Sequence, residues 1–508
     1  MRQQAGIEKD GAHRSDDPVE NGTVARGSDG EDVGRKRPRD KREDEDEAPV
    51  ESNLDPEQSP EPDAWIQGKP SLLLMDNVTL ARATMGTSLG FHIVFAVLGV
   101  GLPLLMLIAE GLWLRTRDEV WLNLARRWSK AFGILFAVGA VSGTTLSFEL
   151  GLLWPRFMAF SGAIFGLPFT AEGFAFFIEA IFLGLYLYGW NRLSPVVHWL
   201  TSIPIAVSGA LSSVFVVMAN AWMNSPSGFH LDTSGRLLDV DPVAAALNPS
   251  TPTEDPHMLV SAYVVTGFLV AAVYAVGILR RRDDALHRRG LVLGMSMAAV
   301  AIVLAGITGD TSARFIYQAQ PAKFAAMEGL YQTVRGAPIH LGGIPIDSEH
   351  RVVGAIEIPY LLSLLAALDP GAEVRGLDSF PPNDRPNPVL VHLSFDTMAG
   401  LGTLIGLTAA LFWLLYMYRR MIPRSRRLLW LIVAAGPASV AAMEAGWFVT
   451  EFGRQPWIVY GILRTSEAAT TAPALGPTFV IFFAIYIGLA ITTARLLLLQ
   501  ARRNRAAP

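Results

Sequence analysis

The sequence contains no cysteine among its 508 residues. This absence excludes disulfide bonds, thiolate metal sites, iron–sulfur clusters and covalently attached c-type haem. Any redox centre must therefore be held by histidine, methionine, carboxylate or another ligand without a thiolate. Charged residues are also scarce, at 17%, whereas hydrophobic residues make up 51% of the chain. A soluble protein of this length needs more polar surface than such a composition supplies.

Long apolar stretches recur along most of the chain, and each is long enough to cross about 30 Å of hydrocarbon. Backbone groups in lipid must be hydrogen-bonded within the protein, so these stretches form helices. We predict an all-α polytopic membrane protein with nine spans and one long outer loop, at about 310–388, between the sixth and seventh spans. The expected spans are about 89–113, 131–153, 167–190, 199–222, 257–279, 290–309, 389–417, 428–450 and 475–499.

Basic residues in the connecting loops predict the orientation of the spans, because loops rich in Lys and Arg stay in the cytoplasm. The connections after the first, fifth and seventh spans carry five basic residues each. The connections after the second and eighth spans carry only one and two. This pattern places the N-terminus and the long loop outside, and the C-terminus in the cytoplasm.

Residues 1–76 form a charged extension before the first span. Its first 74 residues contain 11 basic and 19 acidic side chains, and a composition so poor in apolar residues indicates disorder. The extension lacks the basic–apolar–small order of a signal peptide. An outer N-terminus would require this tail to cross the membrane, so we hypothesise that translation starts at Met75. Mass spectrometry of the native N-terminus tests this, and an intact tail would contradict it.

Four side chains that could bind iron fall at one membrane level near the outer face. His92 begins the first span and His257 begins the fifth, and both spans enter from outside. Met398 lies in the outer part of the seventh span, and Glu444 lies near the outer end of the eighth. Each could instead be an ordinary hydrogen-bonded interfacial side chain, but their shared depth favours ligands. Depth alone does not choose between His257 and His392 as the partner of Met398.

Acidic residues in the third span indicate proton transfer. Glu172 and Glu179 are seven residues apart, which puts both carboxyl groups on one helix face, about 10 Å apart along the axis. Such a pair suits a proton relay, although a carboxylate bonded to a neighbouring helix is the alternative. At the outer interface, Arg454 suits a haem propionate through charge-assisted hydrogen bonds. Lys323 and Glu328, in the outer loop, taken alone form an ordinary amphipathic segment.

Several long motifs together resemble subunit I of cytochrome bd-type quinol oxidases, in the branch with a short Q loop that includes the cyanide-insensitive members. The resemblance covers about 77–508 and implies that this part is a haem-binding transmembrane domain. Its motifs are GFH around His92, FGLPFTAEGFAFFIEAIFLGLYLYGW (165–190), MANAWMNSP (218–226), HMLVSAY (257–263), QPAKFAAMEG (320–329) and EAGWFVTEFGRQPW (444–457).

The resemblance implies roles for the iron ligands. His257 and Met398 would be the axial ligands of a low-spin haem b, and His392 has no role in the family. His92 and Glu444 would serve two high-spin haems, where oxygen is reduced. One of these would be a haem b, and the other either haem d or a third haem b. Asp396 departs from the family, because some members carry Arg at this position.

The resemblance also assigns the remaining polar residues. Glu172 and Glu179 match the acids beside the haem and in the proton path. Lys323 and Glu328 match a pair that contacts quinol in the Q loop, which would be the segment at 310–388.

The implied function is that of a terminal respiratory oxidase in the bacterial cytoplasmic membrane. It would oxidise ubiquinol or menaquinol at the outer face and reduce O2 to water with protons from the cytoplasm, which generates a proton motive force. The implied partners are a second membrane subunit, subunit II, with or without a small accessory subunit, and no nucleic acid. The alternative is a proton-coupled transporter that uses the intramembrane carboxylates. That class predicts repeat symmetry and broken helices in matching halves, which the sequence does not show.

Overall fold

The computed structural model describes residues 75–423, 425–473 and 475–506. The charged extension, on which the hypothesis about Met75 depends, lies outside them except for its last two residues. Whether the extension is translated therefore stays a prediction.

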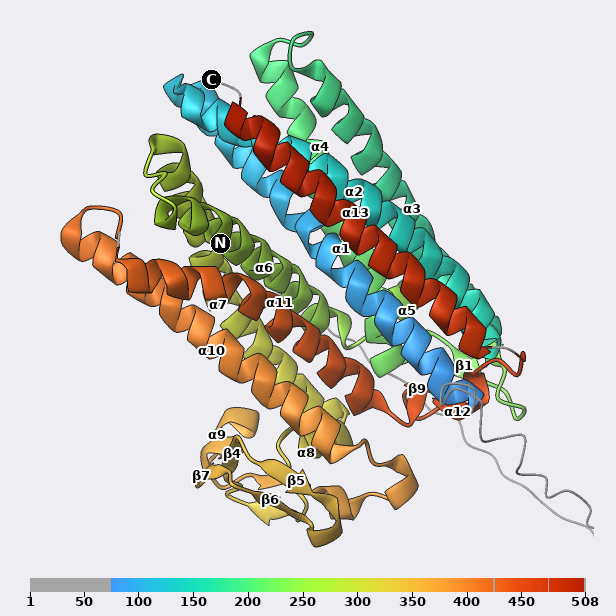
Figure 1. Ribbon diagram of the computed structural model, residues 1–508. Coiled ribbons are helices and arrows are strands. Elements are labelled where there is room, and N and C mark those ends of the chain that lie inside the picture. Colours follow the sequence, from blue (N-terminus) through green and yellow to red (C-terminus); the bar gives the residue numbers. More distant parts are fainter. Residues whose placement is uncertain (1–74, 424, 474, 507–508) are drawn as a thin grey trace, which may run out of the picture. The chain divides into compact units, whose positions relative to one another are not determined.

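Within the described ranges, nine helices are long and apolar enough to cross a membrane. They are α1 (Asn77–Thr116), α2 (Glu119–Leu153), α3 (Pro155–Gly189), α4 (Pro195–Asn224), α6 (Thr251–Leu279), α7 (Ala285–Ala319), α10 (Pro388–Arg419), α11 (Arg426–Arg454) and α13 (Leu475–Ala506) (Figure 1). The predicted all-α membrane fold is confirmed.

Several helices begin well before the apolar stretch that predicts them. The first was predicted from about residue 89, but α1 starts at Asn77 because Asp76 caps it, accepting a hydrogen bond from the Thr79 N–H at 2.9 Å. Asp284 caps α7 in the same way through the His287 N–H. Polar caps satisfy the free N–H groups of a first turn that lies beyond the hydrocarbon. Hydropathy reports only the part of each helix that meets lipid.

The helices pack mainly as sequence neighbours, α1 with α2, α3 with α4, α6 with α7 and α10 with α11. Helix α11 also packs against α6, and α1 packs against α4, α6 and α13. Backbones approach most closely between α6 and α7, where a Cβ added at Gly267 would lie 2.6 Å from the Ala298 nitrogen. Small residues permit such close packing where no hydrophobic force joins helices in lipid.

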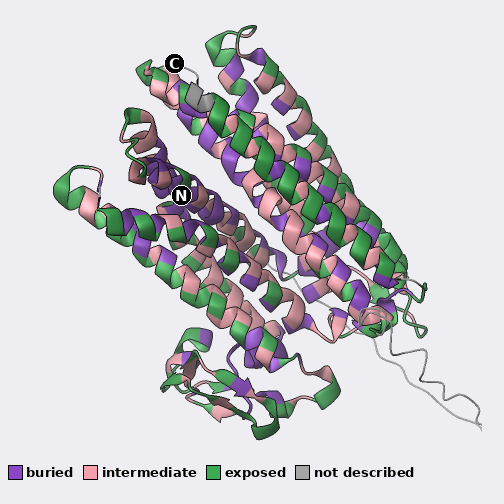
Figure 2. Cartoon of the chain, viewed as in Figure 1, coloured by how far each residue is buried: buried purple, intermediate pink, exposed green. Residues whose placement is uncertain are grey.

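Large apolar side chains are exposed on the outward faces of the helices, among them Phe174 of α3, Leu407 of α10 and Leu498 of α13 (Figure 2). A surface this apolar would be unfavourable in water. It fits contact with lipid.

The loop between α7 and α10 is folded, which its Pro- and Gly-rich sequence did not predict. It contains two short α-helices, three 3-10 helices and six strands, with the strands paired antiparallel as β3–β8, β4–β7 and β5–β6. The α-helices and strands are α8 (Pro321–Met327), β3 (Val334–Arg335), β4 (Ile339–Leu341), β5 (Ile344–Ile346), β6 (Arg351–Val353), β7 (Ile356–Ile358), α9 (Leu361–Ala367) and β8 (Glu373–Val374).

Two further connections lie at the same end of the helices as this loop (Figure 1). One, between α4 and α6, contains β1 (His230–Leu231), β2 (Leu237–Leu238) and α5 (Pro242–Ala246). The other, between α11 and α13, contains β9 (Trp457–Val459), β10 (Leu463–Arg464) and α12 (Thr465–Ala468). We call this end of the protein the loop side.

Candidate functional site

His92 on α1 presents one free ring nitrogen. Its Nδ1 lies 2.9 Å from the Ser142 Oγ on α2, and that hydroxyl donates its own hydrogen to the Val138 carbonyl at 2.9 Å. With its own hydrogen engaged in that bond, the Ser142 oxygen accepts a hydrogen bond from Nδ1–H, the tautomer that leaves the lone pair on Nε2. A Cβ added at Gly143 would lie 3.1 Å from the ring, so this glycine makes room for the imidazole.

His257 on α6 is held in the same way. Its Nδ1 lies 3.1 Å from the Thr308 Oγ1 on α7, and the Thr308 hydroxyl donates to the Leu304 carbonyl at 2.9 Å. The Nδ1 therefore carries the hydrogen and Nε2 the lone pair, the arrangement that orients a metal-binding histidine. A glycine, Gly309, again lies beside the ring, where a Cβ would be 3.2 Å from Cε1.

Met398 and His392 are both on α10 but have different surroundings. The Met398 sulfur faces α11 at Gly446, where an added Cβ would lie 3.0 Å from it. His392 is fully buried, its Nδ1 donates to the Met327 carbonyl at 2.7 Å, and its Nε2 lies 3.3 Å from an Asp396 oxygen. Both ring nitrogens of His392 are thus occupied. Of the two histidines, His257 is the better candidate ligand, because one of its ring nitrogens is free.

Glu444 on α11 has an unpaired carboxyl oxygen. Its Oε1 is buried and has no hydrogen-bond partner within the described chain. Its Oε2 would lie 3.5 Å from a Cβ added at Gly90, two residues before His92 on α1. A buried carboxyl oxygen without a partner is costly, so this geometry fits a group that binds a proton or a cofactor.

Glu451 is a second carboxylate on the same face of α11, and sequence reasoning missed it. Its Oε1 accepts a hydrogen bond from Asn220 at 2.8 Å, and its Oε2 accepts one from Arg454 at 2.6 Å. Arg454 is 1% exposed, and its Nε has no partner in the described residues. The sequence did contain a signal for Glu451, because it follows Glu444 by seven residues within one motif.

Lys323 of α8 is buried at the loop side. Its side chain packs on Gly453, where an added Cβ would lie 2.7 Å from the Lys323 Cγ. Burial lowers the pKa of Lys323 to about 8, against the attraction of the Glu254 carboxylate. The side chain therefore points into the protein between α6 and α11, not into solvent.

Glu328 follows α8 directly and is 4% exposed. Burial, with a smaller contribution from the Asp396 carboxylate, raises the pKa of Glu328 to about 8. The Glu328 backbone carbonyl accepts a hydrogen bond from the His340 Nδ1 at 2.8 Å. The folded loop thus holds a carboxyl group that can exchange protons near neutral pH.

The two predicted acids of α3 face α4. Glu172 accepts a hydrogen bond from the Ser212 hydroxyl at 3.5 Å. Glu179 is 5% exposed, and its Oε1 has no partner in the described part of the chain. A Cβ added at Gly209 would lie 3.1 Å from that oxygen and 3.3 Å from the Gly99 carbonyl. Glu179 therefore lies where α1, α3 and α4 meet.

A cluster of Tyr186, Glu110 and His198 extends the row formed by Glu172 and Glu179 towards the other end of the helices. Tyr186, seven residues after Glu179, donates to Glu110 Oε2 at 2.7 Å. His198 Nδ1 lies 2.6 Å from Glu110 Oε1, and its Nε2 donates to the Tyr186 carbonyl at 2.9 Å. Because Nε2 carries a hydrogen, one further proton must lie between Nδ1 and the carboxyl group. The sequence placed His198 only at the edge of a span and did not predict this proton-holding cluster.

These side chains fit haem better than a bare metal ion. The described residues contain no group of three or more His, Cys, Asp or Glu side chains that could hold an ion. A haem iron takes four ligands from the porphyrin and needs only one or two from the protein. His92, His257 and Met398 offer such ligands singly, each beside a glycine that leaves space.

In the described residues, nine helices could span a membrane and two of them carry imidazoles with a free nitrogen, an arrangement that suits a membrane haem protein. The sequence profile of the family described as cytochrome bd terminal oxidase subunit I matches residues 80–505, so the chain belongs to this family. It is thus a subunit of a terminal oxidase, and the predicted family is confirmed.

Relatives match over most of their length. A putative cytochrome bd menaquinol oxidase subunit I from Bacillus subtilis is 37% identical over 437 residues, which cover 85% of this chain and 98% of the relative. Cytochrome bd-II ubiquinol oxidase subunit 1 from Escherichia coli is 29% identical, covering 85% and 98%. The structure of bd oxidase from Geobacillus thermodenitrificans superposes with a TM-score of 0.81 at 40% identity, covering 84% of this chain and 99% of that one.

Proposed function

We propose that this chain is the haem-binding subunit of an electrogenic quinol:oxygen oxidoreductase. The observation that carries the proposal is the matched pair His92 and His257, each holding Nδ1–H in a hydrogen bond and presenting Nε2. The names of the relatives include a menaquinol and a ubiquinol oxidase, so the substrate is a quinol of one of these classes. A visible absorption spectrum of the purified enzyme tests the proposal, and the absence of haem bands would overturn it.

The proposed ligand roles are supported by which ring nitrogens and sulfur atoms are free. His257 and Met398 would hold a low-spin haem b, and His92 a high-spin haem. When bound, the low-spin haem would supply one-electron transfer and the high-spin haem would supply the chemistry of O2 reduction. A pyridine haemochrome assay distinguishes a protein with haem b alone from one that also holds haem d.

Two carboxylates are candidates for the remaining high-spin haem. Glu444 is favoured by its unpaired, buried oxygen beside the helix of His92. Glu451 is favoured because Asn220 and Arg454 orient it, as outer hydrogen bonds orient metal ligands. We expect replacement of the carboxylate that binds the haem by glutamine to remove one high-spin haem. The same replacement of the other carboxylate should leave the haem content unchanged. Haem quantification of both variants identifies the ligand, and full haem content in both would contradict a carboxylate ligand on α11.

Orientation follows from the charges of the connections. The three arginines between α6 and α7 and the two in the first turns of α7 lie opposite the loop side and would mark the cytoplasmic end. The loop side would then be outside, with the C-terminus in the cytoplasm. A second membrane subunit would complete the enzyme, with or without a small accessory subunit.

Quinol would be oxidised beside Lys323 and Glu328 in the loop at 310–388, which acts as the Q loop. Oxidation of a quinol releases two electrons and two protons, and the protons need an acceptor. The Glu328 carboxylate, with a pKa of about 8, can accept a proton and release it at the loop side. The buried ammonium of Lys323 supplies a positive charge that favours a developing quinol anion.

Replacement of Glu328 by glutamine is expected to slow quinol oxidation about 100-fold, because a positioned proton acceptor contributes at least that much. Haem spectra should not change. In the wild type the rate should rise as the pH increases through about 8, since only the deprotonated Glu328 carboxylate accepts a proton. The variant should lack this rise. Steady-state rates from pH 6 to 9 provide the check.

The matched control is Glu349→Gln, an exposed carboxylate of the same loop whose side chain is 51% accessible and pairs, among the described residues, only with the exposed Arg351. It should keep the wild-type rate and pH profile. Normal turnover in the Glu328 variant would count against a role in quinol oxidation.

Protons for oxygen reduction would travel along α3. Glu172, Glu179 and Tyr186 succeed one another at intervals of seven residues, so their side chains lie on one helix face. Tyr186 joins this line to Glu110 and His198 at the end opposite the loop side. We infer that the cluster receives protons from the cytoplasm and passes them towards Glu179.

A further inference from the structure

In one strand pair of the folded loop between α7 and α10, a polar side chain points into the protein and apolar side chains point outward. In the β4–β7 pair, His340 lies opposite Glu357, and Leu341 lies opposite Ile356. Successive side chains of a strand point to opposite faces. The His340 side chain is 11% exposed and reaches inward to the Glu328 carbonyl. Leu341 and Ile356 must then point outward, and they are 47% and 68% exposed.

Large apolar side chains are also exposed elsewhere in the loop. In the β5–β6 pair Ile344 lies opposite Val353, and both are exposed. Helix α9 buries Leu362, Ser363 and Ala366 and exposes leucines on its other side. We define the aliphatic face as the nine exposed side chains Leu341, Ile344, Val353, Ile356, Ile358, Tyr360, Leu364, Leu365 and Leu368, which range from 38% to 69% exposed. A soluble surface rarely gathers so many large apolar groups.

The aliphatic face adjoins the membrane-facing part of the protein. Helix α9 packs against α7, and strand β5 packs against α10. In Figure 1, α9, β4 and β7 lie together beside the lower part of α10. The two helices themselves expose apolar side chains to lipid, including Val303 and Ile307 of α7. The aliphatic face therefore continues a surface that already meets hydrocarbon.

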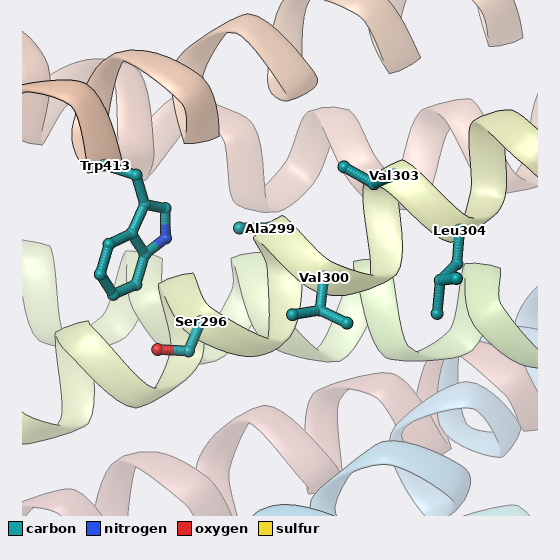
Figure 3. Close-up of a pocket in the computed structure, with 6 residues that line it drawn as sticks. All are labelled: Ser296, Ala299, Val300, Val303, Leu304 and Trp413. Carbon is teal, nitrogen blue, oxygen red and sulfur yellow. The ribbon is translucent and has the colours of Figure 1, made fainter.

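Farther along the same two helices, towards the end opposite the loop side, the outward surface is also apolar (Figure 3). An open groove of about 570 Å³ lies between α7 and α10. Its lining residues are Ser296, Ala299, Val300, Val303, Leu304 and Trp413. Since Trp413 donates its indole N–H to the Met295 carbonyl, the groove offers its neighbours almost only carbon atoms.

We propose that the aliphatic face is immersed in the lipid leaflet on the loop side and holds the loop against the membrane. Quinol would then reach Glu328 directly from lipid, without its apolar tail crossing water. The second statement rests on the proposed function, whereas the immersion does not. His340 links the two, because its ring spans from the outer strand pair to the Glu328 carbonyl.

The composition of the face favours lipid over a protein partner. Protein interfaces are enriched in aromatic residues, methionine and arginine. The aliphatic face has eight Leu, Ile or Val side chains and one tyrosine, and tyrosine is a typical anchor at the membrane–water boundary. The polar tip of the strands, Asp347–Glu349, is the part of the loop that would stay in water.

The absence of cysteine in this chain permits a direct test. Ile356→Cys and Leu365→Cys variants of the whole enzyme are labelled with an environment-sensitive fluorophore and placed in nanodiscs. Ser348→Cys, on the exposed polar tip, is the matched control, and unsubstituted enzyme gives the labelling background. We expect lipids brominated on the acyl chain to quench the labels at 356 and 365 but not at 348. Aqueous iodide should show the opposite order.

Two results would overturn the proposal. Quenching of the 356 and 365 labels by iodide alone would place the face in water. Shielding from both quenchers would mean that a protein partner covers it.

A kinetic comparison separates this proposal from the proposed function. Combined replacement of Ile356, Leu365 and Leu368 by serine should raise KM for long-tailed quinol in membranes and leave KM for a short, water-soluble quinol unchanged. Equal effects on both substrates would contradict entry from lipid. If neither quinol is oxidised even by the unsubstituted enzyme, the proposed function fails, while bromolipid quenching still decides the immersion.

Discussion

Replacement of His257 by alanine is expected to remove the low-spin haem bands from the absorption spectrum and to bring quinol oxidation to background. The reason is the ligand geometry. His257 keeps its Nδ1–H against Thr308 and presents Nε2, while His392, the other histidine near Met398, has both nitrogens occupied. The loss should exceed the roughly 10- to 100-fold effect of removing an outer hydrogen bond from a metal site.

Two further variants calibrate that result. Thr308→Val removes the acceptor that orients the imidazole, so it should weaken haem retention by about 10- to 100-fold without abolishing it. His230→Ala changes a histidine whose side chain is 80% exposed, and it should leave the spectrum intact. Reduced-minus-oxidised difference spectra of the three variants provide the measurement. Unchanged low-spin bands in His257→Ala would refute the ligand assignment.

Membrane spans were predictable because hydropathy is a local property. Every apolar stretch crosses lipid by forming its own backbone hydrogen bonds. The number and order of the nine described helices could therefore be predicted without knowing how they pack. The folded loop was not predictable in this way. Its strands are two or three residues long, and pairs such as Leu341 with Ile356 join segments whose proximity depends on the whole loop.

The candidate site shows the same division. His92 and Glu179 could be singled out because ionisable side chains are rare and costly inside spans. Their partners could not, since Ser142 and Gly209 are common residues in other helices that become informative only when packing brings them near. Depth along a helix can be estimated from sequence, but the direction of a side chain around the axis cannot.

Glu110 illustrates the limit most clearly. From the sequence it was only an acid at the inner end of the first span. In the structure it bonds Tyr186 of α3 and His198 of α4, residues 76 and 88 positions away. A three-helix contact of this kind leaves no periodic pattern in any one helix.

Replacement of Glu179 by glutamine is expected to slow oxygen reduction about 100-fold, in line with the contribution of a positioned proton donor. Glutamine keeps the size of the side chain but cannot carry a proton to or from the site. Among the described residues, Glu179 has no hydrogen-bond partner at Oε1, so the substitution removes the relay without breaking a hydrogen bond at that oxygen. Rapid-mixing measurements of proton uptake, with a pH dye on the cytoplasmic side, should show the same slowing, while haem reduction by quinol stays fast.

A structural role and a relay role make different predictions for the residues around Glu179. If the line along α3 carries protons, Glu110→Gln should slow uptake as well, because it removes the proton held against His198. Glu119→Gln, an exposed acid at the start of α2, is the matched control and should behave as wild type. A purely structural role would lower haem content and thermal stability in the Glu179 variant together with its rate. Fast proton uptake by Glu179→Gln with full haem content would show that protons reach the site by another route.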